Sequence, residues 1–323
     1  MTKFNTISKN IIRRDWGKKI IEFISIHLNS KLTYLGLPSP DAKDIEEWIE
    51  HIDEVIAFQC RDYPNPSSPE QDKKNIEQLQ YKLSEFERKG IINSYVVYDG
   101  YIEEVVLKRR DNTGIEFALN NTIHIFNLDF CNSITSPLEI VEYDTGEVKK
   151  VYKFDAIKIL LELQNLVNSK IKKFVLFLTI KSSYSGKELE DFNSSITQII
   201  PSDISSYEKR IRFLRNYVIT TVKNFFEHNG FIAEFLPTIE YEGDNKHKLL
   251  HFTVIGTNKK DDATPVAPSF QKVDDLIKER FITIDEEELV EKVTEKISES
   301  NLNSCNPVDI FESSKSYNKF WKK

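Results

Sequence analysis

The chain has 323 residues, a formal net charge of −7 at pH 7, and contents of 40% apolar and 29% charged residues. This composition excludes a wholly disordered chain, because enough apolar residues are present to form a core. It also excludes a membrane-embedded chain, since the longest apolar run, Phe174–Ile180, is far shorter than the roughly 18 residues that a membrane helix needs. The negative charge argues against a surface that is basic throughout, but it allows a local basic patch.

The cysteines indicate a reducing environment. Cys60, Cys131 and Cys305 are scattered and form no CxxC pair, which is typical of a cytosolic protein. The first ten residues lack the charged-then-apolar pattern of a signal peptide, so we expect a cytoplasmic location and no membrane partner. His247 and His251 have no third metal ligand close by in the sequence, and we therefore expect no metal site.

Residues 1–30 form the first predicted unit, a basic amphipathic helix. Its apolar residues recur at helical spacing: Ile12, Trp16, Ile20, Phe23 and Ile24. Its basic face is either a solvated surface or a phosphate-contacting one. Under the second interpretation, the candidate nucleic-acid contacts are Arg13, Arg14 and Lys18.

Residues 31–260 form the second predicted unit, which begins with two strand–helix pairs. Leu32–Leu35 reads as a buried strand followed by a turn over Gly36–Pro40, and Asp41 is a suitable N-cap for a helix that reaches Ile49. Val55–Phe58 is the next strand, and a charged helix then covers Glu70–Lys89.

The middle of this unit looks richer in strands. Ser94–Tyr98 and Tyr101–Leu107 both look extended, Thr122–Asp129 is a buried strand, and Leu138–Tyr152 resembles a hairpin.

The rest of the unit returns to alternating helices and strands. Asp155 can cap a helix, Phe174–Ile180 is the clearest central strand, and a polar loop, Lys181–Lys187, follows it. A long helix then ends at His228.

Two strands close this unit. Phe231–Glu242 and Lys248–Thr257 are joined by a short polar turn, which predicts a hairpin. Residues 261–323 are expected to be a linker and a helical tail with a short helix over Asp285–Ile297. The aromatic and basic terminus Tyr317–Lys323 is a candidate docking segment for a protein partner.

This order of elements predicts an α/β fold: a Rossmann-like, mostly parallel sheet with helices on both faces and a C-terminal antiparallel hairpin. Ligands of such sheets bind beyond the carboxyl ends of the strands.

The closing hairpin gives the chain a resemblance to the class I S-adenosylmethionine-dependent methyltransferase superfamily, whose Rossmann-like sheet ends in such a hairpin. Leu32–Pro40 resembles the first strand and cofactor loop of that family, and Val55–Asp62 resembles its second strand. Asn127-Leu-Asp-Phe-Cys131 is similar to the fourth-strand motif, which in nucleic-acid amino-methyltransferases is Asn or Asp followed by Pro-Pro and an aromatic residue.

The motifs are degenerate. The cofactor loop offers Gly36 alone, beside two prolines, and Gln59 and Cys60 stand where the family carries an acid for the ribose. The fourth-strand motif lacks both prolines.

The resemblance implies S-adenosylmethionine as cofactor. The residues expected to bind it are Leu35, Gly36, Pro38, Ser39, Asp62 and Asp99.

The acceptor is expected beside the fourth strand. Asn127, Asp129 and Asn132 would orient an amine, with Phe130 stacked on a base, because methyl transfer to nitrogen needs orientation more than acid–base strength. The alternative is structural: Asp129 caps a turn, and Asn132 satisfies backbone groups.

A second basic cluster starts the long helix before His228. Lys209, Arg210, Arg212 and Arg215 belong to it. Together with the N-terminal helix, this cluster would suit a nucleic-acid surface.

The sequence thus predicts methyl transfer to a nucleic acid or nucleotide, and two alternatives stay open. One is an inert methyltransferase-like scaffold subunit of a larger complex. The other is a metal-dependent hydrolase or nuclease, suggested by Asp99, Glu103, Glu104 and Lys108, although strand alternation would place the two glutamates on opposite faces.

Overall fold

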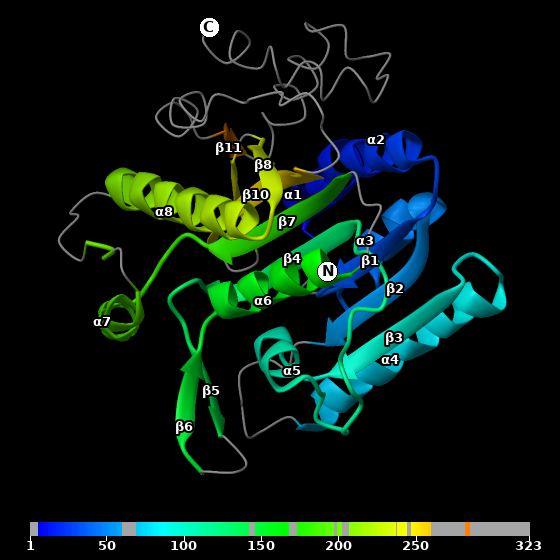
Figure 1. The fold of residues 1–323 in the computed structure, drawn as a ribbon, viewed down its shortest axis with the longest axis horizontal. Helices are drawn as coiled ribbons and strands as arrows, with labels where there is room; N and C mark the ends of the chain where they lie inside the picture. The colour runs from blue at the N-terminus through cyan, green and yellow to red at the C-terminus, as the bar shows by residue number, and fades with distance from the viewer. Residues whose placement is uncertain are drawn as a thin grey trace, which may run out of the picture.

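The architecture is a central sheet between two layers of helices (Figure 1). The structure is a computed structural model that describes residues 6–59, 69–141, 146–167, 173–196, 199–201, 207–236, 238–243, 247–259 and 282–284. The predicted tail helix and most of residues 261–323 lie outside these described residues.

The main sheet is mostly parallel, and its strand order is β11-β9-β10-β7-β4-β1-β2-β3, with β8 also paired to β10. Its strands are β1 (Leu32–Gly36), β2 (Ile52–Gln59), β3 (Ser94–Asp99), β4 (Ile125–Ser133), β7 (Lys173–Lys181), β8 (Phe231–Phe235), β9 (Ile239–Glu242), β10 (Lys248–Asn258) and β11 (Ile282–Ile284). The parallel block runs from β7 through β4, β1 and β2 to β3. Because the chain moves outward from β1 to β3 and then returns to β4 on the other side, the strand order reverses between β1 and β4.

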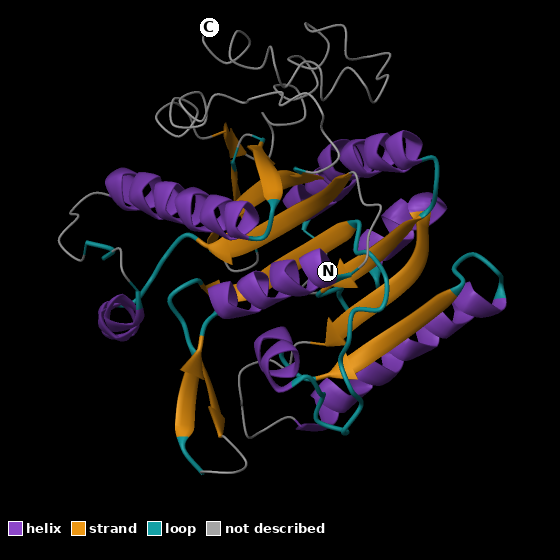
Figure 2. Cartoon of the chain, viewed as in Figure 1, coloured by secondary structure: helices purple, strands orange, loops and turns teal. Residues whose placement is uncertain are grey.

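Helices cover both faces of this sheet, as Figure 2 shows. One face packs against α5 (Ile102–Lys108), α6 (Lys153–Leu166), α7 (Gly186–Ser195) and α8 (Tyr207–His228). The other packs against α2 (Lys18–Leu28), α3 (Lys43–Trp48) and α4 (Pro69–Arg88). The predicted Rossmann-like fold class is therefore confirmed.

The antiparallel end of the sheet is organised by β10. This strand is antiparallel to β7 along its whole length, and its other edge pairs with β8 near its end and with β9 near its start. The predicted single strand Phe231–Glu242 is thus two short strands, while the predicted hairpin into Lys248–Thr257 is confirmed. In register, Gly256 lies opposite Phe174, whose ring fills the space where a side chain would be.

The N-terminal segment is helical, as its apolar spacing predicts. It comprises α1 (Ile7–Ile11), a π-helical turn (Ile12–Gly17) and α2. The indole N–H of Trp48 in α3 donates to the Arg13 carbonyl oxygen at 2.9 Å, which draws that carbonyl away from the regular helical ladder. The segment is therefore fixed to α3 at its π-helical turn.

The prediction for Tyr101–Leu107 is wrong, because this segment is helix α5 rather than a strand. Ile102, Val105 and Val106 are fully buried and follow the i, i+3, i+4 spacing of a helix. The sequence also missed α7, which begins within the predicted loop Lys181–Lys187.

Two helix starts differ from the predictions. Asp155 is the third helical residue of α6 and accepts from the backbone N–H of Tyr152, the true N-cap, at 2.8 Å. Ala42 rather than Asp41 is the N-cap of α3.

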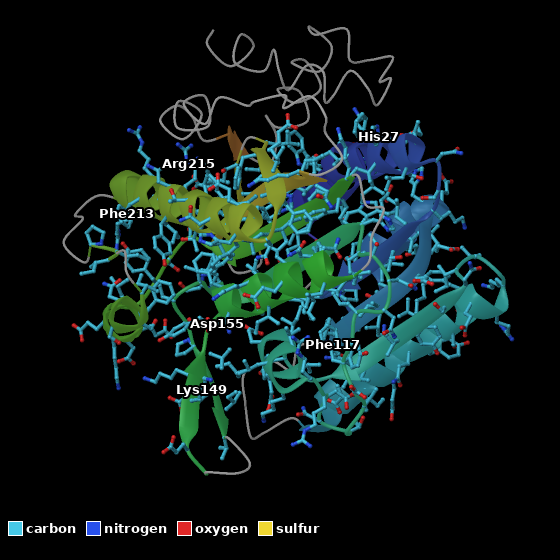
Figure 3. All side chains as sticks on the ribbon, viewed as in Figure 1. His27, Phe117, Lys149, Asp155, Phe213 and Arg215 are labelled. Carbon is cyan, nitrogen blue, oxygen red and sulfur yellow. The ribbon has the colours of Figure 1, made fainter. Side chains whose placement is uncertain are left out.

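A small hairpin, β5 (Leu138–Val141) and β6 (Val148–Val151), projects away from the main sheet (Figure 1). Lys149 lies on this hairpin (Figure 3). Within the described part of the chain, no helix is both long and apolar enough to cross a membrane.

Candidate functional site

A partly open cavity of about 80 Å³ lies beyond the carboxyl ends of the parallel strands. The loop Leu37–Pro40 after β1, Gln59 at the end of β2, and Asn127 and Asp129 in β4 line it. The cavity therefore lies where the strand order reverses, which is the position that an open α/β sheet favours for ligands.

The N-terminal segment forms one wall of this cavity. Lys9, Ile12, Arg13 and Gly17 line it. The Lys9 ammonium group donates to Asp129 Oδ2 at 2.7 Å, and the two side chains are 14% and 26% exposed. This ion pair connects the N-terminal segment directly to the candidate acceptor site.

Strand alternation decides which β4 residues reach the cavity. Asn127 and Asp129 point to the cavity face, whereas Phe130 lies on the opposite face, is only 4% exposed, and packs in the core beneath the Lys153 ammonium group. Asn132 follows a break in the β4–β7 register and is not among the described lining residues. The structure thus brings together two of the four predicted catalytic residues.

A hydrogen-bonded group of three side chains supports the β1 side of the cavity. The carboxylate of Asp44 accepts from the Tyr34 hydroxyl at 2.6 Å and from the Asn127 amide at 2.5 Å. Tyr34 is fully buried, and burial together with the Asp44 carboxylate raises the pKa of its hydroxyl well above 10.0. Tyr34 therefore stays protonated and holds Asp44 in place.

A second hydrogen-bonded chain lines the β10 side. His251 exchanges a hydrogen bond with the Thr179 hydroxyl at 2.9 Å and with the Thr253 hydroxyl at 3.3 Å, and Thr253 accepts from the indole of Trp16 at 2.9 Å. Burial lowers the pKa of His251 to about 4. Burial, and then the Asp129 charge, raises the pKa of the neighbouring Tyr241. Both groups are neutral at pH 7.

The predicted cofactor residues divide into two groups. Pro38 and Ser39 line the cavity, whereas Leu35 is fully buried in the core and Gly36 does not reach the cavity. A Cβ atom at Gly36 would lie 2.4 Å from the Asn127 carbonyl oxygen and 2.7 Å from the Tyr34 hydroxyl. Glycine is therefore required at this position for strand packing.

Of the two predicted ribose-binding acids, the structure describes only Asp99, which does not line the cavity. Asp99 ends β3, where its backbone N–H donates to Asp111 at 3.1 Å, and it is not among the described lining residues. Asp62 lies outside the described residues. Gln59, at the end of β2, occupies the cavity wall instead.

The basic residues of the N-terminal segment have different surroundings. Arg13 lines the cavity and donates to Asn10. Arg14 is exposed and forms an ion pair with Asp15. The Lys18 ammonium nitrogen lies 3.9 Å from Oε1 of Glu47.

The predicted basic cluster on α8 is only partly at the surface. Arg210 and Arg212 are exposed. Arg215, labelled on α8 in Figure 3, is 3% exposed, and burial lowers its pKa to about 10. The side chain of Lys209 is not described. Arg215 thus packs inside the protein and is not available to a phosphate group.

The two glutamates that suggested a nuclease lie near lysine side chains and do not line the cavity. Glu103 is buried 3.9 Å from Lys153, and Glu104 pairs with Lys108 at 2.7 Å. Among the residues that the structure describes, no three His, Cys, Asp or Glu side chains are close enough to hold a metal ion.

The sequence analysis assigned no site role to several polar residues of the cavity wall, among them Lys9, Asp44, Tyr241 and His251. Asp44 follows the predicted cofactor loop by a few residues, and this proximity was a usable signal. Lys9, Tyr241 and His251 reach the cavity only through contacts between distant parts of the chain.

Comparison with solved structures gives matches to methyltransferases. Trm1 from Pyrococcus horikoshii, in complex with S-adenosyl-L-methionine, is 10% identical and has a TM-score of 0.45; the match covers 80% of this chain and 58% of that one. An O-methyltransferase from Bacillus cereus in complex with SAH is 8% identical with a TM-score of 0.37, over 75% of this chain and 80% of that one. A precorrin-6y C5,15-methyltransferase from Geobacter metallireducens is 9% identical with a TM-score of 0.35, over 80% of this chain and 92% of that one. At these scores the fold assignment depends on the strand order and pairing described above.

Comparison at the level of sequence gives one family. No curated protein matches the chain. A family model described as PP_RS20740-like matches residues 8–224, which include the N-terminal segment, the parallel strands and most of the cavity wall. The chain therefore belongs to the PP_RS20740-like family.

Proposed function

We propose that this protein transfers a methyl group from S-adenosylmethionine to a nitrogen atom of a nucleic acid or nucleotide. The observation that carries the proposal is the cavity where the strand order reverses, with Asn127 and Asp129 of β4 in its wall. The antiparallel β10 beside β7 completes the sheet that the resemblance to class I methyltransferases implies.

The residues of the cavity fit the chemistry of that cofactor. Asp44 and Asp129 supply carboxylates for a cationic ligand, Gln59 supplies an amide for hydroxyl groups, and Phe58 and Trp48 supply aromatic walls. The volume of about 80 Å³ is below the range of about 300–1,000 Å³ that is common for small-molecule sites. We therefore expect part of the cofactor to lie in the open mouth.

The roles of the chain's own residues follow from their positions. S-adenosylmethionine supplies an electrophilic methyl group when it is bound. Asn127 is held by Tyr34 and Asp44, so its amide has a fixed orientation. Asp129 Oδ2 accepts a hydrogen bond from the Lys9 ammonium group, and it would accept one from the N–H of an acceptor amine in the same way. The exposed Arg210 and Arg212 would contact phosphate groups.

The first experiment is isothermal titration of the full chain with S-adenosylmethionine and S-adenosylhomocysteine. Micromolar binding of both is the expected result. No binding at millimolar ligand would contradict the proposal and favour an inert scaffold.

The second experiment tests the acceptor site. Asp129→Asn is expected to reduce transfer of a labelled methyl group to RNA or DNA by at least about 100-fold, because the amine loses its orienting charge. Asp191→Asn is the matched control, since Asp191 pairs with Lys150 on the projecting hairpin and does not line the cavity. Full activity of Asp129→Asn would show that the acceptor site is wrongly assigned.

A further inference from the structure

The Lys9 ammonium group occupies a position in the cavity that the proposed reaction needs for an amine. Its Nζ atom donates to Asp129 Oδ2 at 2.7 Å, and Asn127 lies two residues before Asp129 on the same face of β4. Lys9 and Asp129 both line the cavity and both keep part of their side chain exposed, so their ion pair is not sealed inside the core. An amine of the chain itself therefore lies on the carboxylate to which we assign the acceptor.

The backbone around Lys9 holds this amine in place. The Lys9 N–H, in α1, donates to Oγ1 of the N-cap residue Thr6 at 3.3 Å. Ile11 and Ile12 follow it and are buried against β9 and β10. A reacting group held in a fixed orientation can reach an effective molarity of about 10⁵–10⁸ M, which favours an intramolecular reaction over one with an amine from solution.

The side chains beside the ion pair suit an amine that must lose a proton before it reacts. The charges of Lys9 and Asp129 both act on Tyr241 and His251, and these two groups are neutral at pH 7. They therefore add no negative charge that would keep the proton on the amine. Arg13 lines the same cavity, and its positive charge favours the neutral form of the amine.

We propose that Lys9 Nζ is a second methyl acceptor, so that the chain methylates itself at this position. The inference rests on the proposed function, because the methyl donor is S-adenosylmethionine. One proton passes from Nζ to Asp129 Oδ2 along their hydrogen bond and then to water at the open mouth of the cavity. The lone pair on Nζ forms the bond to the methyl carbon, the bond from that carbon to the sulfonium sulfur breaks, and the sulfur keeps its electron pair. The products are S-adenosylhomocysteine and an N-methyl-lysine that keeps its positive charge.

The first test follows a labelled methyl group from S-adenosylmethionine to the lysines of the full chain by peptide mass spectrometry. We expect the label on Lys9 and none on Lys150, the matched control, which pairs with Asp191 at 2.6 Å but does not line the cavity. The rate constant should stay the same over about a 100-fold dilution of the chain, because the amine lies in the chain's own cavity. Asp129→Asn should lower it by at least about 10-fold, since the carboxylate no longer takes the proton, whereas Asp191→Asn should not change it.

The second test involves no methyl transfer. Acetic anhydride modifies lysine amines, and the extent of modification at each lysine is measured with and without S-adenosylhomocysteine. The ligand is expected to slow acetylation of Lys9 by at least about 10-fold, because a ligand in the cavity excludes the reagent, and to leave acetylation of Lys150 unchanged.

Three results would overturn the inference: no methyl group on Lys9, equal labelling of Lys9 and Lys150, or a rate constant that rises with the concentration of the chain. Acetylation of Lys9 that the bound ligand does not slow would overturn it as well. If S-adenosylhomocysteine still binds and a nucleic acid is still methylated, the proposed function stands in each of these cases. If the chain binds neither S-adenosylmethionine nor S-adenosylhomocysteine in isothermal titration, both are overturned.

Discussion

Single residues in this protein owe their charge states to burial, and the histidines show it most clearly. Burial lowers the pKa of His124 and of His251 to about 4. The Nδ1 atom of His124 accepts from the Thr33 N–H at 3.0 Å, a hydrogen bond that protonation of this nitrogen would abolish. Both rings are therefore neutral in the folded chain and become protonated in the unfolded chain below its ordinary pKa of about 6.5.

A pH dependence of stability follows. Because the unfolded chain binds protons that the folded chain excludes, stability is lost as the pH falls from about 6.5 towards 4. Each histidine is expected to lower the free energy of unfolding by about 1.4 kcal/mol per pH unit in this window. Urea denaturation between pH 7 and 5 measures this slope, and His124→Asn should reduce it. An unchanged slope in that variant would show that His124 does not contribute to the pH dependence of stability.

The ion pair between Lys9 and Asp129 is expected to contribute measurably to stability, since both side chains are largely buried. Removing one partner should cost about 1–3 kcal/mol, between the values for exposed and for fully buried pairs. A double-mutant cycle with Lys9→Met and Asp129→Asn should give a coupling energy of about 1 kcal/mol. Additive effects would show that the two charges do not interact.

Some of the site could be predicted from single residues and some could not. Asn127 and Asp129 were found because they stand where an apolar run ends, at the carboxyl end of a strand. Phe130 could have been excluded by the same alternation that selects its neighbours. Lys9 gave no such signal, because its partner Asp129 is 120 residues away.

At the scale of elements, the N-terminal segment forms one wall of the cavity and packs tightly on α3. Its π-helical turn packs so closely on α3 that a Cβ atom at Gly17 would lie 2.9 Å from a ring carbon of Trp48. The turn therefore has room only for glycine at that point.

Gly17→Ala is expected to loosen the segment. The clash should cost about 1–3 kcal/mol and should appear as faster hydrogen exchange in residues 7–17, with little change in the central strands. Gly186→Ala is the control, because the added Cβ at the start of α7 would meet no atom of another part of the chain within 4 Å. Uniformly faster exchange across the sheet would mean that the segment does not open by itself.

The elements themselves were predictable where apolar runs were long. The strands β1, β2, β4 and β7 were identified, since buried parallel strands read as continuous apolar stretches. Helix α5 was mistaken for a strand because seven residues are too few to separate the two periods. The split of β8 from β9 depends on pairing with β10 and has no local signal.

At the scale of the whole molecule, stability depends on the contact between β10 and β7. A Cβ atom at Gly256 would lie 2.2 Å from the Phe174 ring, which itself contacts the rings of Phe126, Phe226 and Phe231. Gly256→Ala is expected to lower the free energy of unfolding by about 3 kcal/mol or to prevent folding. Adding Phe174→Leu should restore part of the loss, measured by urea denaturation. No recovery would indicate that the ring is not the obstacle.

The cavity wall also has a consequence for how the protein is made. Its first described residue is Lys9 and its last is His251, so it is assembled from the beginning of the chain and from a strand that is synthesised much later. During translation the parallel strands can pair before β10 has left the ribosome, but the wall is incomplete until then. A ligand that needs all sides of the cavity can therefore bind only a chain whose synthesis has passed β10, and such binding would distinguish these chains from shorter nascent ones.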